Sequence, residues 1–223
     1  MAHKARRPTK RGPRSARDGE TERQILDAAR TVFIRRGTAG ARMQEIAEEA
    51  GVNQALLHYY FRTKDRLAQS VFRDVAVRLL PSVVRVFGSD DRIEKKVEQF
   101  VHVYIDTVRE SPFIPGHILA ELHYHPERMT VLMSEVAGTS PAAVANAFLP
   151  RLRAQLKQGV AAGTMRPIAP EQFLVNLLAL CVFPFAAKPV LRTVLDMDDA
   201  AFERFLDKRR AELPAFILNA LRP

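Results

Sequence analysis

The side chains best suited to contact a large anionic partner lie close together in residues 54–59. Gln54, Ala55, His58 and Tyr59 have the spacing that places them on one side of an α-helix. A glutamine amide can bond an adenine edge at two atoms, and an alanine methyl can touch the methyl of thymine. A tyrosine hydroxyl can donate to phosphate without base preference. This side of the helix is the one that a DNA major groove would meet if the helix belongs to a helix-turn-helix.

A pattern of two short helices would position these side chains. Gly51-Val52 separates the helices, and Asn53 can cap the second one. The pattern predicts a helix-turn-helix, whose second helix enters the major groove. Ordinary helical hairpins show the same pattern, so both interpretations stay open on these residues alone. The apolar faces would be Met43, Ile46, Ala47 and Ala50 in the first helix and Leu56, Leu57 and Tyr60 in the second.

An amphipathic helix of about four turns is expected before this pair. Thr21 and Gln24 have the spacing of a capping box, and Gly37 is a stop signal. The apolar residues between them recur at helical spacing: Ile25, Ala28, Ala29, Val32 and Phe33.

The positive charge of the chain is concentrated at its N-terminus. The net charge is +9, and residues 1–20 carry seven Lys and Arg against Asp18 and Glu20. This segment has almost no apolar residues, so we expect a disordered arm. A basic arm favours an anionic partner, either nucleic acid or a membrane surface, although a merely solvated tail has the same composition.

The rest of the chain consists of helical patterns separated by loops. No alternating apolar and polar run is bounded by turns, so the fold class is all-α. Pro81, Pro150, Pro184 and Pro214 should kink or split helices. The expected helices cover residues 68–79, 93–108, 116–124, a segment from 126, 142–162, 171–195 and 199–221.

Composition excludes several classes of protein. With 223 residues, 47% of them hydrophobic and 26% charged, and a single cysteine, the chain is neither a disordered polymer nor a disulfide scaffold. The apolar run Phe173–Ala187 is shorter than the roughly 18–20 residues that cross a bilayer, so we expect a buried helix and no membrane partner. Without a secretory signal, a cytoplasmic location is expected. Phosphate-binding, dinucleotide-binding and nucleophile-elbow motifs do not occur, so neither an enzyme nor a bound cofactor is expected.

Three segments together resemble the DNA-binding domain of the TetR/AcrR family of bacterial transcriptional regulators. They are Ile25–Ala29 with Phe33 and Gly37, Ile46–Val52, and Leu57–Leu67, which reads LHYYFRTKDRL. The resemblance covers about residues 21–67. It implies an N-terminal three-helix DNA-binding domain and a larger C-terminal helical domain that binds a ligand and dimerises. The expected organisation is a disordered basic arm at 1–20, the helix-turn-helix domain at 21–67, and the effector-binding and dimerisation domain at 68–223.

The resemblance also implies roles for single residues. Gln54 and Ala55 would face bases, while Tyr59 and Lys64 would hold phosphates. Arg42 would lie near the DNA backbone and substitute for a hydroxyl that is common in the family at that position. Tyr is common where this chain has His58. The expected DNA-binding set is Arg42, Asn53, Gln54, Ala55, His58, Tyr59 and Lys64.

An effector pocket is expected among the helical stripes of the C-terminal domain, although plain core packing accounts for most of these residues. His117, Glu121 and His125 share a helical spacing that could suit a divalent cation, with His102 and His123 nearby. We expect no bound metal and assign these residues as polar groups of an apolar pocket. The pocket candidates are Phe72, Val75, Phe100, Tyr104, His117, Glu121, Phe148, Leu177 and Cys181.

The sequence thus predicts a regulator, a repressor by expectation, that a small apolar effector releases from a palindromic operator. The apolar stripes of 171–195 and 199–221, including Phe202 and Leu206, should pair in a homodimer. A ligand-independent architectural DNA-binding protein is the alternative, although it would not need so large a second domain.

Overall fold

The structure is a computed structural model that describes the backbone of residues 13–223, and the side chains of residues 18–223 apart from Glu121. The described residues are helical and contain no strand, as predicted. They form two compact units, Met1–Val71 and Phe72–Pro223, which are described separately below. Helix α4 (Lys64–Gly88) begins in the first unit and ends in the second.

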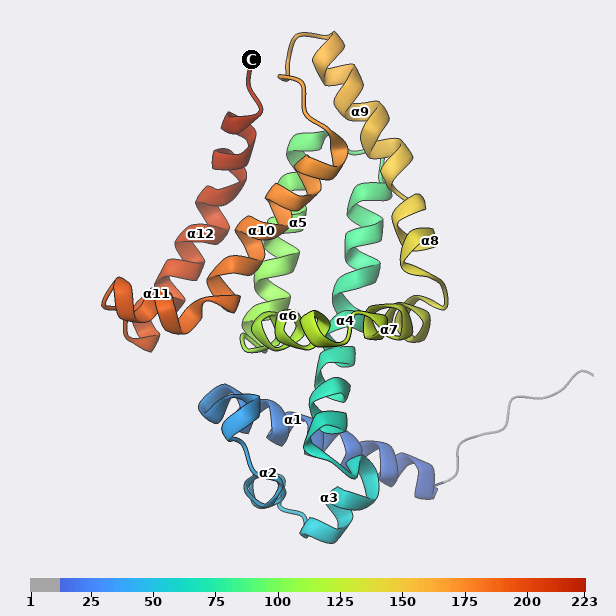
Figure 1. Ribbon diagram of the computed structural model, residues 1–223, viewed down its shortest axis with the longest axis vertical. Helices are drawn as coiled ribbons and strands as arrows, with labels where there is room; N and C mark the ends of the chain where they lie inside the picture. The colour runs from blue at the N-terminus through green and yellow to red at the C-terminus, as the bar shows by residue number, and fades with distance from the viewer. Residues whose placement is uncertain (1–12) are drawn as a thin grey trace, which may run out of the picture. The chain divides into compact units, whose positions relative to one another are not determined.

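Unit 1 contains a long helix and the two short helices of the predicted helix-turn-helix (Figure 1). Its buried core includes Ile25, Phe33, Ile46 and Leu57, all at 0% exposure. These residues come from each of the three helices, so the core joins them into one domain. The helices are α1 (Pro13–Gly40), α2 (Met43–Glu49) and α3 (Gln54–Phe61).

Helix α1 begins earlier than predicted. It starts at Pro13 instead of Thr21, so the expectation of a disordered arm is wrong for residues 13–20. Proline suits the first turn of a helix, and Tyr60 donates a hydrogen bond to Asp18 at 3.3 Å. Residues 1–12 of the predicted arm lie outside the described residues. Near the other end Gly37 leaves helical geometry with φ of 68°, so the predicted stop is a kink, and a short helical turn continues to Gly40.

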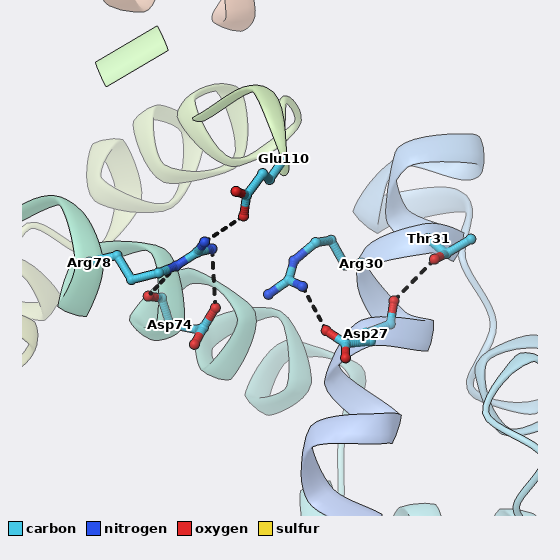
Figure 2. A network of polar contacts seen from close by, with 6 residues as sticks. All are labelled: Asp27, Arg30, Thr31, Asp74, Arg78 and Glu110. Atoms are coloured by element: carbon cyan, nitrogen blue, oxygen red, sulfur yellow. Dashed lines mark hydrogen bonds and ion pairs between the residues drawn. The ribbon is translucent and has the colours of Figure 1, made fainter. Parts of the chain in front are cut away.

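Hydrogen bonds and ion pairs link side chains within each unit (Figure 2). In α1, Arg30 donates to the Asp27 carboxylate at 2.7 Å, and Thr31 donates to the Asp27 carbonyl at 3.1 Å. In unit 2, Arg78 of α4 donates to Asp74 and to Glu110, the residue that caps α5. These ion pairs are partly exposed, so each contributes little to stability.

In unit 2, helix α5 is central and packs against α10 and α12 (Figure 1). One core cluster unites these helices with α9 and the end of α4. The predicted patterns at 142–162 and 171–195 are each two helices, because the chain breaks before Leu149-Pro150 and at Ala187. The helices are α5 (Ile93–Arg109), α6 (Ile114–Tyr124), α7 (Glu127–Ala137), α8 (Pro141–Asn146), α9 (Leu149–Ala161), α10 (Pro170–Ala186), α11 (Lys188–Val194) and α12 (Asp199–Ala220).

A fully buried lysine ties three segments of this core together. The ammonium of Lys96 donates to the carbonyl of Phe87 at 2.9 Å and to Oε1 of Gln155 at 2.7 Å. Burial lowers the pKa of this lysine. Lys96 could not be identified from the sequence, because its position in the apolar stripe of α5 reveals neither acceptor.

An arginine replaces a hydrogen bond that a proline removes. Pro184 lies inside α10 and has no N–H to donate to the carbonyl of Leu180, four residues earlier. Arg209 of α12 donates to that carbonyl from Nε at 3.1 Å and from Nη2 at 2.7 Å. The guanidinium therefore satisfies the acceptor that the proline leaves unpaired in the helix.

Arg209→Met should lower the free energy of unfolding by about 1–3 kcal/mol, because it leaves the Leu180 carbonyl without a partner. Pro184→Ala restores an N–H within α10, so the same substitution should cost less in the Pro184→Ala protein. Urea denaturation of the four proteins of this cycle at one protein concentration measures the difference. Equal costs in both backgrounds would contradict the assignment.

Candidate nucleic-acid interface

Helix α2 supports the helix-turn-helix from within unit 1. Its residues Ile46 and Ala47 are buried, at 0% and 3% exposure. Two ion pairs join it to α1, between Arg35 and Glu49 at 2.6 Å and between Arg36 and Glu45 at 3.3 Å. Apolar burial therefore holds α2 in place, and the exposed ion pairs add little.

The turn between α2 and α3 has the predicted geometry. Gly51 adopts φ of 63°, a conformation that favours glycine. Asn53 caps α3, because its side chain accepts a hydrogen bond from the Leu56 N–H at 2.7 Å. Gln24 donates to the Ala50 carbonyl at 2.8 Å, so it fastens α1 to the turn instead of completing the predicted capping box. That contact joins residues far apart in sequence, which local spacing could not predict.

Helix α3 presents the predicted face to solvent. Gln54, Ala55, His58 and Tyr59 are all exposed, with Tyr59 at 78%. On the opposite side Leu57 is fully buried, and Leu56 and Tyr60 are half-buried. The predicted orientation of α3 is thus confirmed. An exposed helix face with these hydrogen-bonding groups can enter a major groove.

Two further basic residues of the predicted DNA-binding set lie at helix starts in this part of the chain. Arg42 precedes α2, and its side chain is exposed and makes no cap hydrogen bond. Lys64 opens α4 and donates to the carbonyls of Ala39 at 2.8 Å and Ala41 at 3.1 Å. These two bonds hold the Lys64 ammonium in place and leave it a third donor for phosphate.

The candidate effector residues divide into two groups. Phe100, Tyr104, Phe148, Leu177 and Cys181 belong to the core cluster of unit 2. Neither Phe72 nor Val75 belongs to it, and His117 is half-buried outside it. The side chain of Glu121 lies outside the described residues. The structure therefore brings together five of the nine candidates.

The grouped residues form a mainly apolar environment, with the buried Lys96 bonded to the Phe87 carbonyl and the Arg209 guanidinium close enough to act on Cys181. The rings of Phe100 and Tyr104 stack at 5.9 Å, and Phe87 lies 5.4 Å from Phe100. Burial raises the pKa of the Cys181 thiol to about 12 and also raises that of Tyr104, so both stay neutral near pH 7. Among the described residues, no three His, Cys, Asp or Glu side chains converge on a possible metal position.

Two neighbouring grooves open between α10 and α12. They have volumes of about 430 and 310 Å³ and share Leu180 and Phe216. Phe216 is 62% exposed, whereas Phe202 and Leu206 are 0% exposed. The expectation that Phe202 and Leu206 lie in a dimer interface is therefore wrong, because both side chains face the core of their own unit. The expected burial of α10 holds for one face only, since Val175 and Phe183 are exposed.

Two family models match the chain. Residues 25–71 match the model described as bacterial regulatory proteins of the tetR family. Residues 118–216 match the model described as a tetracyclin repressor-like C-terminal domain. The chain belongs to the TetR family. It is therefore a DNA-binding transcriptional regulator, and the resemblance predicted from the sequence is confirmed.

TetR-family relatives align over different parts of the chain. The transcriptional regulator RutR of Escherichia coli (strain K12) is 26% identical over 169 residues, which are 75% of each chain. The transcriptional repressor SCO4008 of Streptomyces coelicolor is 41% identical over 88 residues, 39% of this chain and 44% of the relative. The crystal structure of the TetR-family regulator PfmR from Thermus thermophilus has a TM-score of 0.59 at 17% identity. Its match covers 87% of this chain and 97% of PfmR, and it supports the fold.

In residues 13–223, no single helix is long and apolar enough to cross a membrane. Helices α10 and α11 reach that length only together, and they meet at a bend of 71°.

Proposed function

We propose that this TetR-family protein binds a palindromic operator as a homodimer and represses transcription until a small apolar effector releases it. The exposed face of α3 carries this proposal, because it offers base-reading and phosphate-binding groups on a helix fixed to a rigid core. The relative SCO4008 is named a transcriptional repressor, which supports the sign of regulation. The alternative of an architectural DNA-binding protein leaves Phe72–Pro223, with its own core, without a role.

The two grooves between α10 and α12 support the proposal of a homodimer. Phe216 lines two mainly apolar grooves, which also carry Arg166, Lys208, Arg209 and Glu212, so each copy would offer both an exposed ring and a groove that can receive one. That self-complementarity suits a two-fold interface, where the same patch serves both partners. A two-fold dimer would place two α3 helices on symmetric half-sites, which is why we propose a palindromic operator.

The five grouped candidates in unit 2 support an apolar effector. Phe100, Phe148 and Leu177 offer apolar contacts, and Tyr104 and Cys181 offer uncharged polar groups. An effector that prefers a conformation with badly spaced α3 helices lowers operator affinity by the ratio of its affinities for the two states. Thermal-shift screening of uncharged apolar compounds, followed by operator release, tests this part of the proposal.

Base reading by α3 is tested by selecting duplexes from a random pool and comparing variants on the selected sequence. Gln54→Ala should cost about 1–3 kcal/mol, confined to one base pair in each half-site. Tyr59→Phe should weaken binding to all sequences about equally, because phosphate contacts do not specify bases. Gln172→Ala, which replaces an exposed glutamine at the start of α10, serves as control. A Gln54→Ala protein that keeps every base preference would refute the assignment.

A further inference from the structure

His58 connects the base-reading amide of α3 to the end of its own helix. Its Nδ1 lies 3.0 Å from the carbonyl oxygen of Arg62, and its Nε2 lies 3.5 Å from Nε2 of Gln54. Arg62 directly follows the last residue of α3 and has φ of 51°, so the helix ends there. Its carbonyl oxygen is the atom that His58 contacts. The imidazole therefore bridges a side chain of the first turn of α3 and a backbone carbonyl just past the end of the helix, eight residues apart.

The first of these contacts determines the tautomer of the ring. A carbonyl oxygen can only accept, so the neutral imidazole carries its proton on Nδ1 and donates to Arg62. Nε2 is then left with a lone pair. The Gln54 amide must turn its NH₂ group toward that lone pair, because the opposite orientation would set the amide oxygen against it.

This orientation limits which base Gln54 can read. With one N–H directed to His58, the amide keeps one N–H and its oxygen for DNA. Adenine needs that combination, since its N7 accepts and its N6 donates in the major groove. Guanine presents two acceptors, O6 and N7, and requires two donors. The remaining groups of Gln54 thus match adenine and not guanine.

We propose that His58 is a specificity-determining positioning residue, which selects adenine over guanine by holding the Gln54 amide. This inference rests on the proposed function, in which Gln54 reads a base. His58 acts through Gln54, so its effect should vanish when the Gln54 amide is absent. No contact between His58 and DNA is required.

The experiment uses the full-length protein and a duplex that the wild type selects from a random pool. The base pair read by Gln54 is located as the one whose preference Gln54→Ala removes. Affinities are then measured for duplexes with A·T or G·C at that pair. His58→Phe keeps a ring but neither nitrogen, and it should lower the adenine-over-guanine ratio about tenfold, within the range of a good bidentate contact.

Three further variants identify the cause. His58→Gln should keep most of the ratio, because its amide oxygen can take the place of Nε2 as acceptor. His58→Phe should leave the ratio unchanged in a Gln54→Ala background, and Gln172→Ala, at an exposed glutamine of α10, should leave the wild-type ratio unchanged. Each ratio compares two duplexes with one protein, so a general loss of affinity cancels.

The outcomes separate this inference from the proposed function. If the wild type shows no base preference that depends on Gln54, base reading by α3 is refuted and the role of His58 with it. If Gln54 reads adenine but His58→Phe keeps the full ratio, only the role of His58 is refuted. A loss of equal size in the Gln54→Ala background would also overturn it, since His58 would then contact the base itself.

Discussion

Phe216→Asp should convert the proposed homodimer into monomers and lower operator affinity by about 100-fold or more. The substitution removes the ring that would fill the partner's groove and puts a charge into a mainly apolar interface, whose grooves also carry Arg166, Lys208 and Arg209. Operator affinity falls when the dimer dissociates, because a monomer contacts only one half-site. Linking two binding modules typically raises overall affinity by a factor of about 10²–10⁴. Sedimentation velocity and operator titration at the same protein concentration measure both effects.

Val131→Asp is the matched control for this substitution. Val131 lies on α7 and is 56% exposed, close to the 62% of Phe216, so it tests the effect of an added surface charge. It should remain dimeric and bind as the wild type does. A Phe216→Asp protein that sediments as the wild-type dimer would show that another surface forms the interface.

The corrected dimer face illustrates what the sequence could and could not predict. Periodicity correctly indicated that α12 has an apolar stripe, and it identified Phe202 and Leu206 within it. A stripe does not reveal whether its covering surface belongs to the same chain or to a partner. Both residues are buried within their own unit. The exposed apolar ring of α12 is Phe216, which lies nearer the C-terminal end of the helix.

The helix-turn-helix was predictable because its signals are local. Gly51 supplies the turn, Asn53 supplies the cap, and helical spacing divides α3 into a buried and an exposed face. The contacts that sequence analysis missed are non-local. Gln24 meets a carbonyl 26 residues away, and Arg209 meets one 29 residues away. Neither spacing corresponds to a helical or turn pattern.

Removal of residues 1–12 should reduce the salt dependence of DNA binding. This segment contains Lys4, Arg6, Arg7, Lys10 and Arg11 and precedes the first residue of α1. If each of two arms neutralises one to three phosphates, the slope of log K against log salt should become shallower by about 2–5 units, at roughly 0.9 per contact. Base preference should barely change, because phosphate contacts position without specifying. Titrations at four salt concentrations measure the slope.

The deletion ends at residue 12 so that it spares the helix. A longer deletion would also remove Asp18, which accepts the hydrogen bond from Tyr60 of α3. Substitution of the five basic residues by Gln in the full-length chain is the companion variant, since it keeps the length and removes the charge. Superimposable slopes for all three proteins would mean that this segment does not contact phosphate.

The effector candidates were the least predictable part of the chain. Helical stripes identify which residues turn inward, and five of the nine indeed share one core cluster. Core packing and a ligand pocket place the same residue types at the same spacing, so a single sequence does not separate them. The grooves beside Leu180 and Phe216 depend on how α10 and α12 cross, which is set by the packing of both helices on α5.

Footprinting of the wild-type protein on a duplex selected from a random pool tests the central claim most directly. We expect protection of two inverted half-sites whose centres lie about 10–10.5 base pairs, or a multiple of that spacing, apart. Protection should weaken at one base pair per half-site in Gln54→Ala. Uniform protection with no preferred sequence, or a protected site without two-fold symmetry, would contradict an operator read by two α3 helices.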